Sequence, residues 1–423
     1  MEKFIIRGGE PLNGDVAISG MKNSALPILF GTILANEVCI IDNLPDISDV
    51  KDSLAILESV GASVRFIGTN TVVIDTRQVT PKSPPLELVS KIRASYYLFG
   101  AMLGRFNQAR VGQPGGCDFG NGRPIDLHLR SFTMLGAKVS FESNASITLN
   151  APDGLRGTSI YFDMASVGAT INIMYAAAFA EGVTVIENAA REPHIVDTAC
   201  FLNACGANIM GAGTTTIRIK GVKKLHGCNY SIAPDMIEAG TYMIAGAITK
   251  GKVRVTNIIP KHMDALTSKL IEAGVPIEIG DSYITVNPTE NLKSVPIKAN
   301  PYPGFPTDMQ PQFSALMTVA QGVSQISDGI YSTRFKYKDY LANMGANITY
   351  DEQKASLSII GVTELSGATV KASDLRAGAA LILAGLAAKG TTTVTNVELV
   401  ERGYDHIIEK LRALGANIKR EKI

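Results

Sequence analysis

The chain has 423 residues, of which 46% are hydrophobic and 19% are charged, and its formal net charge is +1. This length allows two or three domains with sizeable cores. A net charge so close to zero gives no support for binding nucleic acid or a membrane surface through bulk electrostatics. Any anionic ligand must therefore be held by basic residues placed locally.

The N-terminal segment, residues 1–7, lacks the basic region and the long apolar run of a signal peptide. No stretch approaches the roughly 20 apolar residues of a membrane helix. The most apolar stretch, residues 377–388, is short and contains two glycines. We therefore expect a soluble, cytoplasmic protein that does not insert into a membrane.

Five cysteines make an odd count and form no paired CxxC motif. This pattern favours neither a disulfide framework nor a zinc site. Cys39, Cys200, Cys205 and Cys228 lie in helix-like segments or in or beside short apolar runs, so we interpret them as core residues. The five histidines are scattered without HxxxH spacing, and we assign no residue as a metal ligand.

A pattern of a helix end, a glycine and a strand recurs along the chain about every 70 residues. The glycines are Gly61, Gly136, Gly206, Gly274, Gly345 and Gly415. A glycine after the last helical residue is a common way to end a helix. Each copy is predicted to hold an Ala/Gly-rich helix, a β-branched strand, a loop, and then the helix that ends at the glycine. Six such α/β units fit two domains of three units each.

The order of the copies predicts where the domains divide. Residues 22–233 hold three copies, and residues 1–21 with 234–423 form the second domain. The opening strands, within residues 5–19, precede the first helix and so belong to the other domain. The chain then crosses twice between domains, which predicts a hinge near residues 20–22 and 231–235.

The second copy differs from the others after its β-branched strand, where residues 113–124 form a long loop with four glycines and Cys117. Glycines let a backbone approach a ligand closely, and so irregular a loop lies at the surface. A structural cysteine normally sits in an apolar element. Cys117 is therefore a candidate functional thiol on a lid over substrate. The alternative is a turn whose cysteine is incidental.

Charged or polar residues begin the first helix of every copy. They are Lys22 with Asn23, Arg93, Ser166 with Val167 and Gly168, Asp235, Asp308 and Arg376. If these helix N-termini face one cleft, their dipoles and free N–H groups form an anion-binding centre. Arg123, Arg334 and Arg402 would add bidentate contacts. The alternative for Lys22 and Arg376 is a solvated surface charge, and for Arg402 a residue that opens a helix.

Asp308 lies just ahead of a predicted helix. The commonest role of an aspartate there is to cap the helix N-terminus. The other role is a general base, which requires that the carboxylate converge with the cations. The sequence alone leaves both open.

Several ordered motifs in both halves resemble the UDP-N-acetylglucosamine 1-carboxyvinyltransferase family. They are residues 20–27 (GMKNSALP), the Pro-Gly-Gly-Cys loop, residues 166–170 (SVGAT), 188–193 (NAAREP), 305–310 (FPTDMQ), 374–376 (DLR) and 402–404 (RGY). The resemblance implies two inside-out α/β barrels of three repeats each, with the active site in the cleft between them. It implies transfer of the enolpyruvyl group of phosphoenolpyruvate to the 3′-hydroxyl of UDP-N-acetylglucosamine. Phosphate is released, no metal or redox cofactor takes part, and the reaction is the first committed step of peptidoglycan synthesis.

The resemblance also implies roles for individual residues. Cys117 would protonate the phosphoenolpyruvate methylene and react with the epoxide fosfomycin, and Asp308 would take the proton of the sugar hydroxyl. Phosphoenolpyruvate would be held by Lys22, Arg93, Arg123, Arg376 and Arg402. The sugar nucleotide would contact Asn23, Arg93, Arg123, Pro124, Ile125, Asp126, Leu127, Ser166, Val167, Gly168, Asp308, Ile330, Tyr331 and Arg334.

Two other functions stay open at this point. One is the sister reaction, in which shikimate 3-phosphate accepts the enolpyruvyl group, because a shared fold does not fix the substrate. The other is a turnover-impaired paralogue that binds the sugar nucleotide and regulates. The presence of Lys22, Cys117, Asp308 and Arg402 argues against the second.

Overall fold

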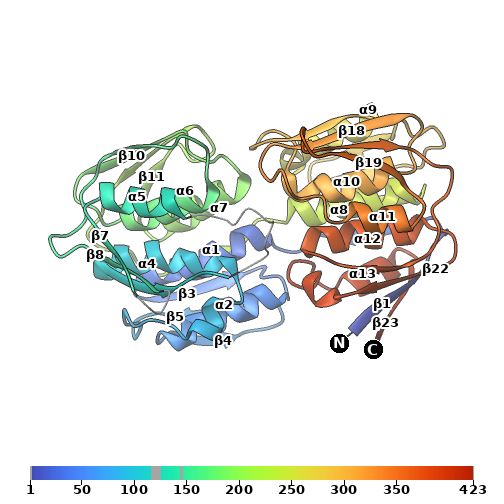
Figure 1. Cartoon of the computed structure of the whole chain (residues 1–423). Coiled ribbons are helices and arrows are strands. Elements are labelled where there is room, and N and C mark those ends of the chain that lie inside the picture. The colour runs from blue at the N-terminus through green and yellow to red at the C-terminus, as the bar shows by residue number, and fades with distance from the viewer. Residues whose placement is uncertain (1, 116–124, 143–145, 423) are drawn as a thin grey trace. The chain divides into compact units, whose positions relative to one another are not determined.

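The computed structural model describes residues 2–115, 125–142 and 146–422. The chain forms two compact units, residues 20–233, called here the middle unit, and residues 1–19 with 234–423, called the terminal unit (Figure 1). The hinge expected between them stays a prediction. No helix in the described ranges is both long and apolar enough to cross a bilayer.

Six copies of one α/β unit make up the two compact units, as the glycine pattern predicts. The first helices are α1 (Lys22–Ala35), α4 (Tyr97–Phe106), α6 (Val167–Ala177), α8 (Met236–Ile248), α10 (Gln310–Met317) and α12 (Leu375–Ala387). The central strands are β3 (Val38–Asp42), β6 (Gln108–Gly112), β10 (Val183–Glu187), β14 (Lys252–Thr256), β18 (Val323–Asp328) and β22 (Thr391–Thr395). The second helices are α2 (Ser48–Ser59), α5 (Asp126–Met134), α7 (Pro193–Ala204), α9 (Asp264–Glu272), α11 (Lys338–Asn343) and α13 (Ile407–Ala413).

Two further strands follow the second helix in five copies, and in the sixth one strand follows it and pairs with the N-terminal strand. The first of them are β4 (Ser63–Phe66), β7 (Lys138–Phe141), β11 (Asn208–Met210), β15 (Ile277–Ile279), β19 (Asn347–Asp351) and β23 (Asn417–Lys422). Their partners are β5 (Val72–Asp75), β8 (Ser146–Asn150), β12 (Thr216–Lys220), β16 (Tyr283–Val286), β20 (Ser356–Ile360) and, for β23, the N-terminal strand β1 (Glu2–Arg7). All six predicted glycines separate a second helix from its strand with φ between +84° and +110°. This backbone region strongly favours glycine, so the predicted role of these residues is confirmed.

Among the described residues, five of the six sheets have four strands, with one parallel strand at the edge beside the central strand. The parallel strands are β13 (Asn229–Ser231), β9 (Ser159–Tyr161), β2 (Asn13–Ala17), β17 (Ile297–Ala299) and β21 (Thr369–Lys371). In the second copy the sheet is β6-β8-β7. The described residues ahead of its first helix form the short helix α3 (Leu86–Val89) and the 3-10 turn η1 (Arg93–Tyr96) instead of a parallel strand.

The N-terminal strands complete the terminal unit. β1 pairs with β22 and β23, and β2 pairs with β14. In the same way β13, near the end of the middle unit, pairs with β3 near its start. Each unit is therefore closed by strands that lie far apart in the sequence.

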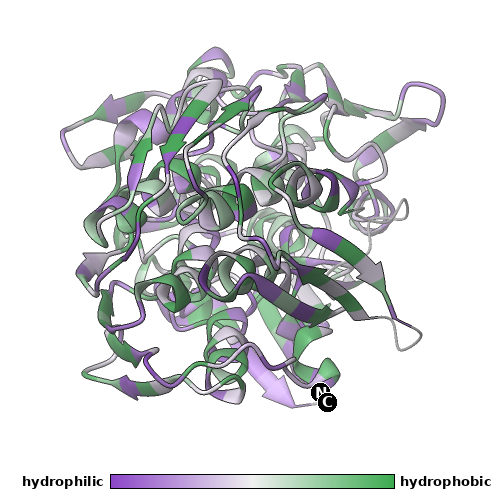
Figure 2. Ribbon diagram, turned by 90° about the vertical axis from the view of Figure 1, so that its left-hand side faces the viewer, coloured by the Kyte–Doolittle hydropathy of each residue, from purple (hydrophilic) through white to green (hydrophobic). Residues whose placement is uncertain are grey.

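The first helices form the core of each unit. Nearly every residue of α1, α6, α8, α10 and α12 is buried. Within the middle unit α4 packs against α1 and α6, and within the terminal unit α8, α10 and α12 pack on one another. Gly100 allows close approach, because a Cβ there would lie 2.4 Å from the Asn172 carbonyl oxygen. In Figure 2 the strands alternate between hydrophobic and hydrophilic residues, as one-sided packing on these helices requires.

An asparagine turns the chain after the central strand in four copies. Asn43, Asn188, Asn257 and Asn396 have left-handed φ between 54° and 57°. Each donates its side-chain amide to the carbonyl oxygen just beyond the neighbouring parallel strand, at 2.7 to 3.5 Å. Asparagine tolerates this conformation better than most residues. We call these four positions the asparagine corners.

Candidate active site

Asp308 lies in the 3-10 turn η3 (Thr307–Met309) that leads into α10. Its carboxylate does not cap the helix, because the residue at the N-cap of α10 is Met309 and no side-chain cap bond forms there. The N-cap interpretation is therefore wrong. The carboxylate instead accepts hydrogen bonds from Arg334 Nη1 at 2.8 Å and from Arg376 Nη2 at 3.1 Å. The convergence with cations that a catalytic role requires is present within the terminal unit.

Burial and charge act in opposite directions on this carboxylate. The Asp308 side chain is 26% exposed, whereas those of Arg334 and Arg376 are 4% and 3% exposed. Burial raises the pKa of Asp308, but the charges of Arg376 and Arg334 and their hydrogen bonds lower it well below its usual range. Asp308 is consequently ionised throughout the physiological pH range. The interpretation of Arg376 as a solvated surface charge is wrong.

Both arginines are positioned by other polar groups. Arg334 Nη1 also donates to the Thr307 hydroxyl at 3.1 Å, and that hydroxyl donates to Asp328 Oδ2 at 2.5 Å. Asp374 caps α12 by accepting from the backbone N–H groups of Arg376 and Ala377 at 2.9 and 3.0 Å. The Arg376 guanidinium lies 5.4 Å from the centre of the Tyr404 ring, a distance at which cation–π attraction operates.

Arg402 lies two residues before Tyr404, in a turn between η4 (Val397–Leu399) and α13. It therefore does not open a helix. The Tyr404 hydroxyl accepts from Gln312 Nε2 at 3.0 Å, and the same amide nitrogen donates to the Asp308 backbone oxygen at 2.9 Å. These bonds connect the turn that carries Arg402 to the turn that carries Asp308.

Ile330 and Tyr331 follow the central strand β18. Their backbone N–H groups both donate to Asp328 Oδ1 at 2.8 Å. The N–H groups are thus committed to the protein. The Tyr331 ring lies 5.8 Å from the Arg334 guanidinium.

In the middle unit, Lys22 begins α1 and is 9% exposed. Its ammonium lies 2.8 Å from the carboxylate of Asp49 in the first turn of α2. The interpretation of Lys22 as a solvated surface charge is wrong. Because an ammonium has three donors, it can contact Asp49 and an anionic ligand together. Asn23 follows in the same first turn and is half-buried.

Arg93 begins η1, and its guanidinium lies 5.4 Å from the centre of the Tyr96 ring. On the Tyr96 ring also packs His128, whose ring meets that of Tyr96 edge-on with the centroids 5.0 Å apart. Burial, and then the charge of Arg93, lower the pKa of His128 to about 3. His128 is therefore neutral in the folded protein at physiological pH.

Asn172 fixes the tautomer of His128. The Asn172 side-chain oxygen accepts from the Gly100 N–H at 2.8 Å, so its amide nitrogen faces His128 Nδ1 at 3.0 Å. Since that nitrogen donates, Nδ1 accepts and the ring proton lies on Nε2. This buried network was missed by sequence reasoning. Its members come from α4, α5 and α6. The one feature of the sequence that could have pointed to it is that His128 directly follows Asp126 and Leu127, which are predicted site residues.

Ser166 caps α6, accepting from the Ala169 N–H at 3.3 Å. Val167 and Gly168 form the first turn. A Cβ at Gly168 would lie 2.7 Å from the Tyr96 hydroxyl oxygen and 2.8 Å from a His128 ring carbon. The segment is therefore held against Arg93, Tyr96 and His128 as one group.

Ile125, Asp126 and Leu127 open α5, where Asp126 is exposed and the other two are half-buried. Cys117, Arg123 and Pro124 lie outside the described residues. The described site residues thus divide between the two units. Those of the middle unit lie at helix starts, whereas in the terminal unit Asp308 and Arg376 lie at helix starts and Ile330, Tyr331, Arg334 and Arg402 lie in turns.

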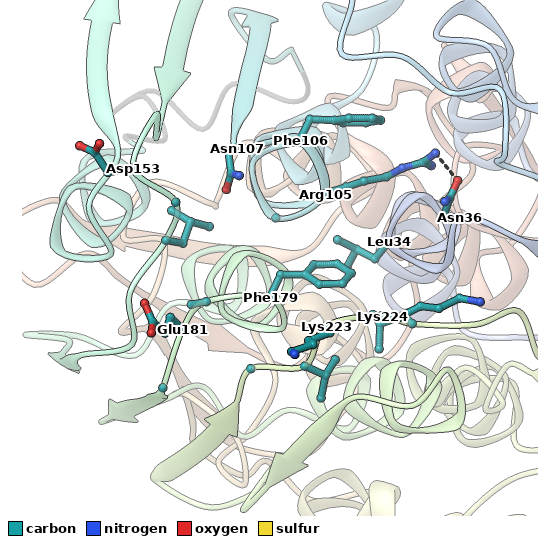
Figure 3. Close-up of a pocket in the computed structure, with 18 residues that line it drawn as sticks. Leu34, Asn36, Arg105, Phe106, Asn107, Asp153, Phe179, Glu181, Lys223 and Lys224 are labelled. Atoms are coloured by element: carbon teal, nitrogen blue, oxygen red, sulfur yellow. Dashed lines mark hydrogen bonds between the residues drawn. The ribbon is translucent and has the colours of Figure 1, made fainter.

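An open hollow of about 840 Å³ lies elsewhere in the middle unit, and no predicted site residue lines it. Figure 3 shows Leu34, Asn36, Arg105 and Phe106 around it, at the C-terminal ends of α1 and α4. Arg105 donates there to the Ile33 carbonyl oxygen at 2.9 Å and to Asn36. A helix of 14 residues such as α1 is about 21 Å long, so this hollow is separate from Lys22.

Comparison with known proteins decides the family. A family model described as EPSP synthase (3-phosphoshikimate 1-carboxyvinyltransferase) matches residues 6–411. UDP-N-acetylglucosamine 1-carboxyvinyltransferase 2 of Clostridium acetobutylicum is 52% identical over 100% of both chains. UDP-N-acetylglucosamine 1-carboxyvinyltransferase 3 of Caldanaerobacter subterraneus subsp. tengcongensis is 51% identical over 99% of both. The chain belongs to the UDP-N-acetylglucosamine 1-carboxyvinyltransferase family.

Solved structures agree with this assignment. The enolpyruvyl transferase NikO from Streptomyces tendae is 26% identical, with a TM-score of 0.90 over 100% of this chain and 99% of its own. An EPSP synthase from Acinetobacter baumannii is 19% identical, with a TM-score of 0.75 over 100% of both chains, which shows a shared fold. The enolpyruvyl transferase fold expected from the sequence is confirmed, and so is the resemblance to the UDP-N-acetylglucosamine 1-carboxyvinyltransferase family.

Proposed function

We propose that this protein transfers the enolpyruvyl group of phosphoenolpyruvate to the 3′-hydroxyl of UDP-N-acetylglucosamine and releases phosphate, in the first committed step of peptidoglycan synthesis. The observation that carries the proposal is the full-length identity of 52% with an enzyme of that name. The sister reaction with shikimate 3-phosphate is not favoured, because the likeness to EPSP synthase structures is 19–20% identity and concerns the fold. We also propose that the fold consists of two inside-out barrels with three units each, and that the protein is located in the cytoplasm.

Asp308 is proposed to accept the proton of the sugar hydroxyl. Arg334 and Arg376 keep the carboxylate ionised, so it is always available as an acceptor. Its low pKa makes it a weak base, and proton transfer therefore becomes favourable late, when the hydroxyl oxygen gains positive charge on forming the C–O bond. Before that step the carboxylate orients the hydroxyl.

The charges of phosphoenolpyruvate are proposed to be held by Lys22, Arg93, Arg123, Arg376 and Arg402. A protein of net charge +1 needs such local cations to bind a phosphate and a carboxylate together. Burial of Lys22 and Arg376 supports the proposal, since partly desolvated cations bind anions more strongly than solvated ones. No metal or redox cofactor is needed for this chemistry.

The remaining assignments rest on the family resemblance. Cys117 is proposed as the acid that protonates the methylene carbon of phosphoenolpyruvate and as the target of fosfomycin. The sugar nucleotide is proposed to contact Asn23, Arg93, Arg123, Pro124, Ile125, Asp126, Leu127, Ser166, Val167, Gly168, Asp308, Ile330, Tyr331 and Arg334. The caps at Ser166 and Asp374 support the proposal by fixing the starts of α6 and α12.

The test is phosphate release from phosphoenolpyruvate with each acceptor in turn. We expect release with UDP-N-acetylglucosamine, none with shikimate 3-phosphate, and loss of release in Cys117→Ala. Turnover of shikimate 3-phosphate would overturn the substrate assignment. Binding of the sugar nucleotide by calorimetry, without phosphate release from either acceptor, would establish the regulatory paralogue instead.

A further inference from the structure

Three cysteines that lie far apart in the sequence meet in the middle unit. Cys39 is in the central strand β3, Cys205 ends α7, and Cys228 directly precedes β13. Their sulfur atoms all lie within 4.8 Å of one another, and those of Cys205 and Cys228 are 3.4 Å apart. Cys39 and Cys205 are buried and Cys228 is half-buried.

Regular structure holds the three sulfurs in place. β3 and β13 are neighbouring parallel strands, and the Ile40 N–H donates to the Cys228 carbonyl oxygen at 2.9 Å. The Cys205 N–H is bonded within α7, and the His226 N–H donates to the Cys205 carbonyl oxygen at 2.9 Å. A site built on strands and a helix end is more rigid than one built on free loops.

The spacing of the sulfurs fits a bound metal ion. In a tetrahedral site with Zn–S bonds of about 2.3 Å, the sulfurs stand about 3.8 Å apart. One separation here is 3.4 Å and the other two are at most 4.8 Å, which is compatible with that value. Thiolates are soft ligands that select ions such as Zn²⁺ over Mg²⁺ or Ca²⁺.

His226 lies near Cys205 and is the candidate fourth ligand, although neither of its ring nitrogens lies within 4.8 Å of all three sulfurs, so its side chain would have to turn toward them to coordinate. A Cβ at Gly206, the residue after Cys205, would lie 3.1 Å from His226 Nε2. The other ring nitrogen, Nδ1, lies 3.0 Å from the Gly227 carbonyl oxygen and donates to it. Histidine ligands in metal sites usually donate their second N–H to such an acceptor, which leaves the remaining nitrogen free to coordinate.

We propose that Cys39, Cys205 and Cys228 bind one Zn²⁺ ion, with His226 as the fourth ligand. Binding replaces three thiol protons, which pass to the buffer, and leaves the imidazole neutral. The ion would tie β3 and the end of α7 to the segment that enters β13. This site is independent of the proposed transferase reaction, since none of its residues belongs to the candidate active site. Three buried cysteines that merely pack as small hydrophobic residues are the alternative.

The experiment measures Zn²⁺ and Co²⁺ binding by the full chain under reducing conditions. It is done on the wild type and in a Cys117→Ala background, which removes the one cysteine outside the described residues. We expect one ion per chain, release of about three protons on binding, and a sulfur-to-cobalt charge-transfer absorption. Saturating Zn²⁺ should raise the melting temperature by roughly 5 °C at a hundredfold excess over Kd.

Matched variants decide the assignment. Cys228→Ser changes the least buried member of the cluster, and Cys200→Ser is the control, an exposed cysteine on α7 outside it. We expect at least about a tenfold loss of affinity in Cys228→Ser and no change in Cys200→Ser. His226→Ala should alter the Co²⁺ spectrum, and an unchanged spectrum would overturn the fourth ligand. The proposal would be overturned if the folded wild type bound no stoichiometric metal under reducing conditions. It would also be overturned if Cys228→Ser bound the metal as tightly as the wild type.

Discussion

The asparagine corners and the equivalent corner at Asp328 show how one scaffold carries both structural and functional turns. At Asn43, Asn188, Asn257 and Asn396 the side chain donates a hydrogen bond to the carbonyl oxygen just beyond the neighbouring parallel strand. At Asp328 the backbone N–H of Gly329 donates to the strand instead, at 2.9 Å. The freed carboxylate accepts from Thr307, Ile330 and Tyr331.

The exchange of asparagine for aspartate converts a donor into an acceptor. Asp328 thereby orients Thr307, Thr307 orients Arg334, and Arg334 contacts Asp308. The second copy departs further, since a glycine-rich stretch follows its central strand in the sequence and its sheet has the order β6-β8-β7. The two copies that depart from the common corner are the ones that carry Cys117 and Asp308, the residues proposed for proton transfer.

The largest expected effect comes from the carboxylate at the end of this chain of contacts. Asp308→Asn keeps the shape but removes the charge between two buried guanidinium groups, and we expect turnover to fall about 10²- to 10⁴-fold. The control is Asp264→Asn, a first-turn aspartate of α9 whose side chain is 58% exposed. Phosphate release measures both. Turnover within about threefold of the wild type in Asp308→Asn would remove Asp308 from the chemistry.

Replacing Asp328 by the asparagine found at the other corners should affect activity, whereas changing one of those asparagines should affect stability. Asp328→Asn keeps Oδ1 but deprives the Thr307 hydroxyl of its acceptor, so we expect kcat/KM to fall about tenfold, which corresponds to about 1.4 kcal/mol. Asn257→Gly is the matched change at a structural corner, since glycine accepts the left-handed backbone. It should lower the melting temperature by about 2–4 °C through one lost hydrogen bond and leave kcat/KM unchanged. Equal effects on activity from both variants would contradict the distinction.

The repeated glycines offer a test of the scaffold alone. A Cβ at Gly61 (φ +110°) would lie 2.5 Å from the Gln78 carbonyl oxygen, whereas one at Gly345 (φ +92°) meets no atom within 4 Å. Gly345→Ala therefore costs backbone strain only, about 1 kcal/mol, and Gly61→Ala adds a steric clash for a total of about 2–4 kcal/mol. Urea unfolding measures both. If Gly345→Ala lost more unfolding free energy than Gly61→Ala, steric space around the glycines would not determine the cost of the substitution.

The smallest expected effect concerns the pH dependence of stability in the middle unit. The pKa of His128 is lowered to about 3 in the folded protein, while an unfolded histidine titrates near 6.5. The unfolded chain therefore binds more protons between these values, and stability falls as the pH drops below 6.5. From pH 7 to pH 5.5 this group alone should contribute a loss of about 1 kcal/mol.

His128→Gln should remove that contribution while keeping a polar side chain beside Asn172. The readout is the change in unfolding free energy between the two pH values, because the variant can shift overall stability at both. His128 is the eighth residue before the repeat glycine Gly136. The equivalent residues are Ser53 in the first copy and Thr198 in the third, both of which are buried and neither of which titrates in this range. An unchanged pH dependence in His128→Gln would show that His128 is protonated in the folded state.

Much of the fold could be predicted because its signals are local. A glycine that must adopt positive φ and an alternating strand are visible within about ten residues of sequence. The role of Asp308 could not be decided, because its partners lie 26 and 68 residues away. The absence of a parallel strand beside β6 in the described residues, the Asn172–His128 contact and the meeting of three cysteines likewise depend on packing between copies, which no local pattern encodes.

The closure of the terminal unit by β1 and β2 sets an order for its assembly during synthesis. Residues 20–233 form a continuous stretch that can complete its own sheets while the ribosome is still translating the rest. The strands β1 and β2 are made before the middle unit, yet β1 finds its neighbours β22 and β23 only after residues 391–422 have been made. Throughout that interval β1 exposes an unpaired edge, the kind of surface that chaperones shield and that aggregates form on. The strand β1 is therefore made early and reaches its native position late.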